Sequence, residues 1–151
     1  MINLKRLVQI FEMTQEEVLE YMAKFLKSKK YQIFKTDEFI FGIGKIPILL
    51  IAHADTVHRE KPKICINLTQ KLVTAPNGLG ADDRAGVLGI IEILEKYKPY
   101  VLITTDEESG CIGAYSFCDF VMPEDLNLKY IIELDRKGKD DAVFYDCDNK
   151  E

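Results

Sequence analysis

The sequence predicts an α/β fold in which helices cover both faces of a mixed, mostly parallel central sheet, giving a three-layer sandwich. Three strongly apolar segments, at 46–53, 100–105 and 128–134, have the composition of strands that are buried on both faces. Helical periodicity over 84–97 and at 111–119 places helices between these strands. This alternation of helices with apolar strands is typical of a parallel sheet.

The segments that precede the first buried strand predict two helices and a hairpin. Apolar residues at helical spacing predict a helix over 3–12. A second helix follows Thr14, where "TQEE" has the pattern of a capping box closed by Glu17. The segments 31–35 and 38–44 alternate apolar and polar residues on either side of a Thr-Asp pair, which predicts a β-hairpin.

Short apolar segments predict further strands at 63–68, 71–75 and 142–146. The sequence contains no internal repeat, low-complexity segment or linker. Its 151 residues are enough for one domain with a sizeable core. We therefore expect residues 1–151 to form a single domain.

Composition excludes several classes of function. The net charge of −5 gives no basic surface for nucleic acid. The longest apolar run, residues 46–52, is too short to span a membrane, and no signal peptide is recognisable. The four cysteines form no C-x-x-C pair, so we expect reduced thiols and a cytoplasmic protein. Oligomeric state leaves no signature in the sequence.

A histidine and several carboxylates follow the predicted buried strands or begin a predicted helix. They are His53, Asp55, Asp82, Asp83, Asp106, Glu107, Glu108 and Asp135. In sheets of this type, ligands bind beyond the carboxyl ends of the strands. Histidine nitrogen and carboxylate oxygen are ligands for zinc, and a further carboxylate beside the metal can serve as a general base.

Each of these residues taken alone has a simpler explanation. His53 could be a satisfied core histidine, Asp82 a helix cap, and Asp135 a cap at a strand end. A phosphate-binding loop is excluded because Asp83 occupies the position of the third glycine in G-x-G-x-x-G. A metal site, in contrast, explains why all these residues occur together at successive strand ends and at a helix start.

Four motifs, "HAD", "GADDRAG", "TTDEESGCIGA" and "ELD", occur in an order that resembles the co-catalytic di-zinc exopeptidases, which include tripeptidase-T-like and leucyl-aminopeptidase-like enzymes. The resemblance runs from about residue 46 to 135 and more loosely through the whole chain. It implies the phosphorylase/hydrolase fold of the zinc peptidases. It also implies a cis peptide bond between Asp82 and Asp83.

The resemblance further implies a role for each residue of the motifs. His53 and Asp135 would bind the first zinc, Asp82 would bridge both zinc ions, and Glu108 would bind the second. Asp55 would hold the His53 ring, and Glu107 would be the general base.

The chain departs from the family pattern in two respects. The second zinc of the family takes a histidine from near the C-terminus, but this sequence has two histidines, and His58 does not match that position. We expect His58 to be an exposed loop residue and the chain to be a fragment that lacks the final strands and the last ligand. The spacing between the motifs also leaves no room for the lid domain that larger relatives carry.

The function that the resemblance implies is zinc-dependent hydrolysis of short peptides. Cobalt or manganese could occupy the same oxygen-rich ligands. Two alternatives stay open at this point. One is an amidohydrolase or deacylase that cleaves N-acyl amino acids, and the other is an inactive domain that binds metal or peptide.

Overall fold

A computed structural model describes residues 3–121, 126–138 and 142–143. Its helices are α1 (Leu4–Phe11), α2 (Gln15–Ser28), α3 (Ala81–Leu94) and α4 (Ile112–Phe120). Its strands are β1 (Gln32–Lys35), β2 (Phe39–Ile43), β3 (Ile46–His53), β4 (Cys65–Asn67), β5 (Leu72–Thr74), β6 (Pro99–Thr104) and β7 (Tyr130–Glu133).

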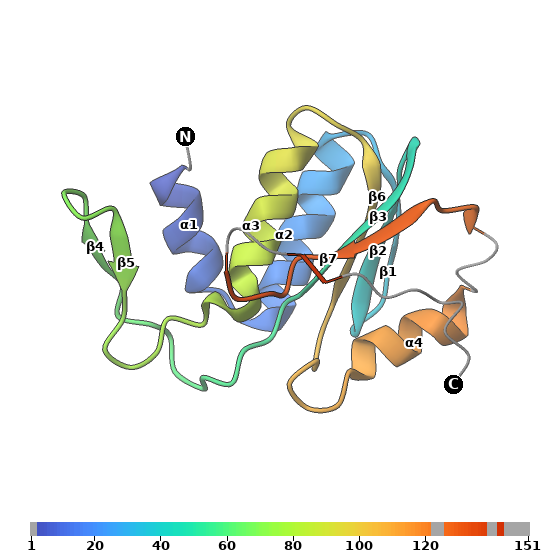
Figure 1. The fold of residues 1–151 in the computed structure, drawn as a ribbon. Helices are drawn as coiled ribbons and strands as arrows, with labels where there is room; N and C mark the ends of the chain where they lie inside the picture. Colours follow the sequence, from blue (N-terminus) through green and yellow to red (C-terminus); the bar gives the residue numbers. More distant parts are fainter. Residues whose placement is uncertain (1–2, 122–125, 139–141, 144–151) are drawn as a thin grey trace.

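The central sheet has five strands in the order β1-β2-β6-β3-β7 (Figure 1). β3 pairs in parallel with β6 and with β7, whereas β2 pairs antiparallel with β1 and with β6. Consequently β1, β3, β6 and β7 point in one direction and β2 in the other. The predicted mixed sheet and the predicted hairpin of β1 and β2 are both confirmed, and the sheet is partly parallel, with two parallel and two antiparallel pairings among the described strands.

Two apolar clusters fill the space between the sheet and the helices. The larger cluster packs α1, α2 and α3 against one face of the sheet, and its members include Ile10, Met22 and Ile90. The smaller cluster packs Phe117 of α4 against Phe41 of β2 and other residues of the opposite face. Helices therefore cover both faces, as the predicted three-layer sandwich requires (Figure 1).

The helix boundaries follow local signals in the sequence. The backbone N–H of Glu17 donates to Thr14 Oγ1 at 3.2 Å, and the N–H of Thr14 donates to Glu17 Oε2 at 2.8 Å. These two bonds complete the predicted capping box at the start of α2. In α3 the backbone of Asp82 and Asp83 is not helical, and the chain enters the helix through Gly80 at φ +64°.

One prediction about the sheet is wrong, because β7 is not buried. The exposed fractions of Tyr130, Ile131 and Ile132 are 64%, 54% and 44%. β7 lies at the edge of the sheet beside β3, and the described residues leave much of both its faces uncovered. The strand predicted over 142–146 lies outside the described residues except for 142–143, which are not in a strand.

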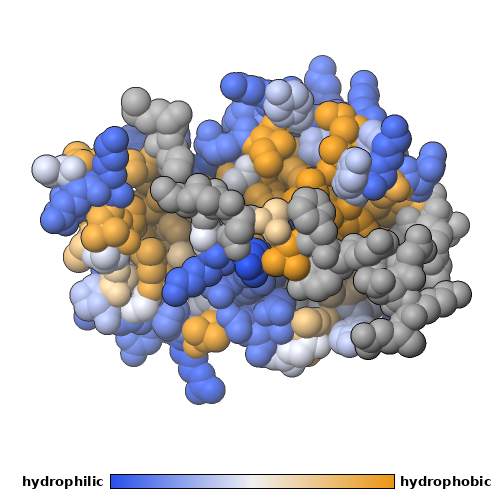
Figure 2. Space-filling view, viewed as in Figure 1, coloured by the Kyte–Doolittle hydropathy of each residue, from blue (hydrophilic) through white to orange (hydrophobic). Residues whose placement is uncertain are grey.

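β4 and β5 form a separate two-stranded antiparallel ribbon away from the central sheet (Figure 1). Figure 2 shows apolar side chains at the surface of this ribbon, where Ile66, Leu68 and Leu72 are exposed. No helix among the described residues is long and apolar enough to cross a membrane.

Candidate metal centre

The predicted site residues gather at one edge of the central sheet. His53 is the last residue of β3 and lies opposite Thr104, the last residue of β6. The segments after β6 and β7 carry Glu107 and Asp135, respectively. Because these three strands are parallel, their carboxyl ends meet at the same edge, as the sequence predicted.

His53 is oriented by Asp55. The His53 side chain is 2% exposed, and its Nδ1 lies 3.1 Å from Asp55 Oδ1. A carboxylate bonded to Nδ1 fixes the ring and leaves Nε2 as the nitrogen that can bind a metal. This geometry matches the arrangement expected for the H-x-D motif.

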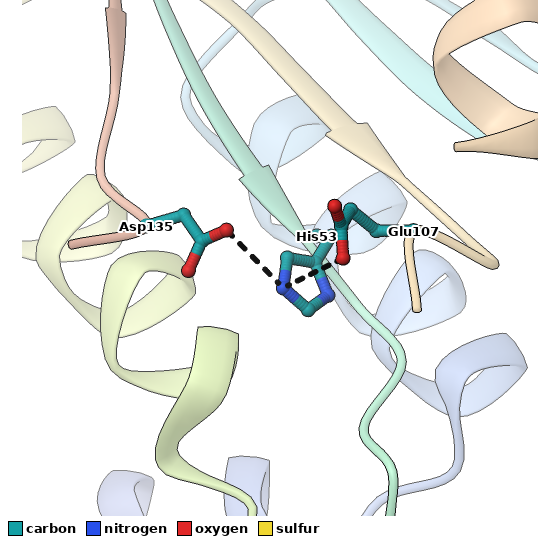
Figure 3. A group of neighbouring side chains, drawn as sticks. All are labelled: His53, Glu107 and Asp135. Carbon is teal, nitrogen blue, oxygen red and sulfur yellow. Dashed lines mark ion pairs between the residues drawn. The ribbon is translucent and has the colours of Figure 1, made fainter. Parts of the chain in front are cut away.

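Three carboxylates surround the Nε2 atom of His53. Asp82 Oδ1 lies at 3.3 Å, Asp135 Oδ2 at 3.7 Å and Glu107 Oε2 at 3.9 Å. Figure 3 shows Asp135 and Glu107 approaching the ring from opposite sides. The three acids come from segments far apart in the sequence, so the fold itself assembles the cluster.

Two sets of side chains in this cluster could each hold a metal ion. One set is His53, Glu107 and Asp135, and the other is His53, Asp82 and Glu108. In each set the candidate ligand atoms lie within 4.8 Å of one another. One imidazole nitrogen with several carboxylate oxygens is a donor set that suits zinc and also manganese or cobalt. The residues present therefore fit a divalent metal.

The charges of the cluster change the pKa values of its members. Burial alone would lower the pKa of His53, but the hydrogen bond and charge of Asp55 and the nearby Asp83 and Asp135 raise it to about 9. Burial and the neighbouring Asp82 raise the pKa of Asp135 to about 6. The carboxylates thus repel one another, and a positive charge among them is favourable. When no metal is bound, protonated His53 supplies that charge.

Asp55 also holds the loop that carries the two glutamates. Its Oδ1 accepts a hydrogen bond from the backbone N–H of Glu107 at 3.1 Å, and its Oδ2 accepts one from the N–H of Glu108 at 3.0 Å. Burial acts to raise the pKa of Asp55, but the hydrogen bond with His53 and these two backbone bonds lower it below its ordinary value. Asp55 therefore couples the histidine to the loop after β6.

Asp83 has a structural role that the sequence did not predict. Its side chain is buried, and it accepts hydrogen bonds from the backbone N–H of His53 at 3.3 Å and of Gly86 at 2.8 Å. Burial raises the pKa of Asp83 to about 7. The peptide bond between Asp82 and Asp83 is cis, as the resemblance implied. The two hydrogen bonds of Asp83 connect the start of α3 to the end of β3, while the Asp82 side chain remains 70% exposed.

Arg84 is a second buried residue that the sequence gave no reason to select. It is 3% exposed, and its guanidinium donates to the carbonyl oxygen of Ile10 at 2.9 Å. Its Nε has no hydrogen-bond partner among the described residues, and burial lowers its pKa to about 10. Arg84 thus connects α1 to the segment that carries Asp82.

A cavity of about 500 Å³ adjoins the cluster. Its wall includes Asp55, Glu108 and Arg84, together with loop residues such as His58. His58 is exposed, as expected, and its ring packs against Gly78. The cavity is large enough for a side chain or a short segment of a peptide beside the candidate metal ligands.

Solved structures of three peptidases resemble this fold. The tripeptidase from Staphylococcus aureus matches with a TM-score of 0.69 and 21% identity, over 91% of this chain and 45% of its own. The aminopeptidase PepT from Bacillus cereus matches with a TM-score of 0.71 and 22% identity, over 90% and 43%. The dipeptidase Dug1p from Saccharomyces cerevisiae matches with a TM-score of 0.67 and 13% identity, over 87% and 38%.

The chain has the fold of a peptidase catalytic domain. It spans less than half the length of these solved structures. Neither the protein-family models nor the curated proteins that were compared match the sequence. At these identities the likeness concerns the fold, which confirms the fold that the four sequence motifs implied.

Proposed function

We propose that this domain binds divalent metal, with zinc as the preferred ion, and hydrolyses short peptides. The observation that carries this proposal is the convergence of His53, Asp82, Glu107, Glu108 and Asp135 from separate segments at one sheet edge. A metal bound there would polarise the scissile carbonyl group and make water more acidic. The peptidase-like fold supports a peptide as the substrate class.

Four residues would hold the metal. We assign His53, Asp82 and Asp135 to the first ion, and Asp82 and Glu108 to the second. This assignment differs from the two groups of neighbouring side chains in two respects. Asp82 takes the place of Glu107 beside His53 and Asp135, and the second ion does not share His53. We leave Glu107 unbound to metal because a hydrolase also needs a base beside the ions.

Glu107 would move the proton in the reaction. Its side chain is 34% exposed, so water and substrate can reach it. As a carboxylate it would take a proton from the attacking water and deliver that proton to the amine that leaves when the C–N bond breaks. Asp55, which accepts the backbone N–H of Glu107, would keep this side chain beside His53.

The substrate would occupy the cavity beside Glu108. A short peptide is the substrate that the proposal favours, and an N-acyl amino acid on the same scaffold is the enzymatic alternative.

The unpaired state of Cys65, Cys111 and Cys118 suits the reducing cytoplasm in which we propose that the protein acts.

A second candidate function is that of a domain that binds one metal ion without turnover. The two candidate groups share His53, and its Nδ1 is already bonded to Asp55. A single free nitrogen cannot serve two ions. The second ion would then have only Asp82 and Glu108, which is a weak ligand set.

An assay of purified protein separates these functions. Di- and tripeptides and N-acetyl amino acids are incubated with protein to which zinc, cobalt or manganese has been added, and released amines are quantified. Release from peptides that disappears on chelation supports the proposal. Release from N-acyl amino acids alone supports the deacylase, and metal uptake without release from either class supports the binding domain.

A further inference from the structure

Gln15, at the start of α2, contacts the loop that carries Glu107 and Glu108. Its side-chain Nε2 donates to Asp106 Oδ1 at 3.2 Å, and the backbone N–H of Asp106 donates to Gln15 Oε1 at 3.4 Å. The backbone N–H can only donate, so it fixes the orientation of the Gln15 amide. The two residues are 91 positions apart in the sequence.

Asp106 is the point at which the loop leaves the strand direction. Its φ is +54°, a left-handed conformation that costs energy for a residue other than glycine. The next two residues, Glu107 and Glu108, donate their backbone N–H groups to Asp55. A contact that fixes Asp106 therefore helps to fix the backbone from which the side chains of Glu107 and Glu108 extend.

The backbone bonds on the carboxyl side of this loop come from the turn before α4 and from its first residue, and they do not reach Asp106 Oδ1. The backbone N–H of Ile112 donates to the Asp106 carbonyl oxygen, and the N–H of Gly110 donates to that of Glu107. Among the described residues, Gln15 is the hydrogen-bond partner of the Asp106 side chain and of its backbone N–H. Gln15 also lines the cavity together with Asp106 and Glu108.

We propose that Gln15 is a positioning residue that holds the left-handed turn at Asp106 and thereby sets the placement of Glu107 and Glu108 in the metal centre. The expected effect on metal binding rests on the proposed function, but the expected effect on the loop does not. The placement of the loop can be measured without any metal.

Gln15→Glu separates this role from a role in the helix. The introduced carboxylate at the start of α2 would favour the helix through its dipole. It would also face the carboxylate of Asp106 and repel it. A residue that served only α2 would therefore tolerate or benefit from the change, whereas a residue that positions the loop would not.

The test uses the full chain in four forms: wild type, Gln15→Glu, Gln15→Glu with Asp106→Asn, and Gln9→Glu as a control. Gln9 is exposed on α1, so the control makes the same chemical change away from the loop. Amide exchange of Glu107 and Glu108 is followed by NMR in metal-free protein. Zinc affinity is then measured by calorimetry.

We expect Gln15→Glu to speed exchange at Glu107 and Glu108 at least about tenfold and to weaken zinc binding about tenfold. The second substitution, Asp106→Asn, supplies an amide that can donate to the introduced carboxylate, so the double variant should recover both properties. Unchanged exchange in Gln15→Glu, or no recovery in the double variant, would overturn the proposal. Wild-type protein that binds no zinc would contradict the proposed function, while the exchange data would still decide the role of Gln15.

Discussion

The Nδ1 atom of His53 lies 3.1 Å from Asp55 Oδ1, and the same carboxylate accepts the backbone N–H groups of Glu107 and Glu108. One aspartate thus sets the orientation of the imidazole and the path of the loop after β6. Both parts of the candidate metal centre depend on this side chain, which is largely buried. The dependence can be tested by removing one of its two acceptor oxygens.

Asp55→Asn should weaken zinc binding by about 10- to 100-fold, which is the usual effect of changing a partner that orients a ligand. The substituted amide has one oxygen, so it cannot accept from His53, Glu107 and Glu108 as the carboxylate does. Calorimetric titration with zinc checks the prediction. Asp119→Asn is a matched control, because this exposed acid on α4 undergoes the same charge change. Equal zinc affinities for the Asp55 and Asp119 variants would disprove the orienting role.

Glu107→Ala should reduce peptide hydrolysis about a thousandfold or more, because the reaction loses its base. Metal content should stay nearly unchanged, since Glu107 is not among the residues assigned to hold the ions. Turnover and bound zinc are measured on the same preparations. If the variant loses zinc together with activity, Glu107 is a ligand, as its distance-based grouping with His53 and Asp135 allows.

The metal-free protein should become less stable as the pH rises from 6.5 to 9. The folded-state pKa of His53, about 9, exceeds its ordinary value of 6.5, so its proton stabilises the fold below pH 6.5 and that contribution is lost through pH 9. The loss is about 3 kcal/mol in the free energy of unfolding. Asp83 also makes the protein less stable as the pH rises, but at lower pH. Its pKa is about 7 in the folded state and 3.8 ordinarily, so between these values the unfolded state releases a proton that the folded state retains.

Urea denaturation in the presence of a chelator, at several pH values, measures this dependence. His53→Gln should remove most of the slope between pH 6.5 and 9, because the variant has no proton to lose there. A wild-type stability that is flat or rises across this interval would show that the proton on His53 does not stabilise the fold.

Gly86→Ala should destabilise the protein by about 2–3 kcal/mol. A Cβ atom at this position would lie 2.2 Å from Asp83 Oδ1, so the buried carboxylate would have to move and lose its bonds to the backbone. Gly89→Ala in the same helix is the control, because its Cβ would meet only the end of the Leu134 side chain at 3.1 Å. Thermal unfolding of both variants makes the comparison, and equal destabilisation would contradict the role assigned to Asp83.

The sequence predicted the elements whose signals are local. The capping box of Thr14 and Glu17, the hairpin and the strand that ends at His53 all follow from neighbouring residues. The gathering of the candidate site residues could be predicted because parallel strands bring their carboxyl ends together. The exposure of β7 could not be predicted, because burial depends on what covers a strand, and an apolar composition does not reveal the neighbouring elements.

The structural roles that the sequence did not predict depend on partners far along the chain. Asp83 bonds to His53 over 30 positions, Arg84 to Ile10 over 74, and Gln15 to Asp106 over 91. None of these pairs has a spacing or motif that marks it in one sequence. The glycine three residues after Asp83 was the one local hint, since it leaves space for the buried carboxylate.

Zinc binding by metal-free protein tests the metal centre most directly. Native mass spectrometry and calorimetry would count the ions bound and measure their affinity for wild type and for His53→Ala, with His58→Ala as the control. We predict about one or two zinc ions per chain, a loss of affinity of about 100-fold or more in His53→Ala, and no change in His58→Ala. Wild-type protein that binds no zinc, or a His53 variant that binds as wild type does, would contradict the assignment of this sheet edge as a metal site.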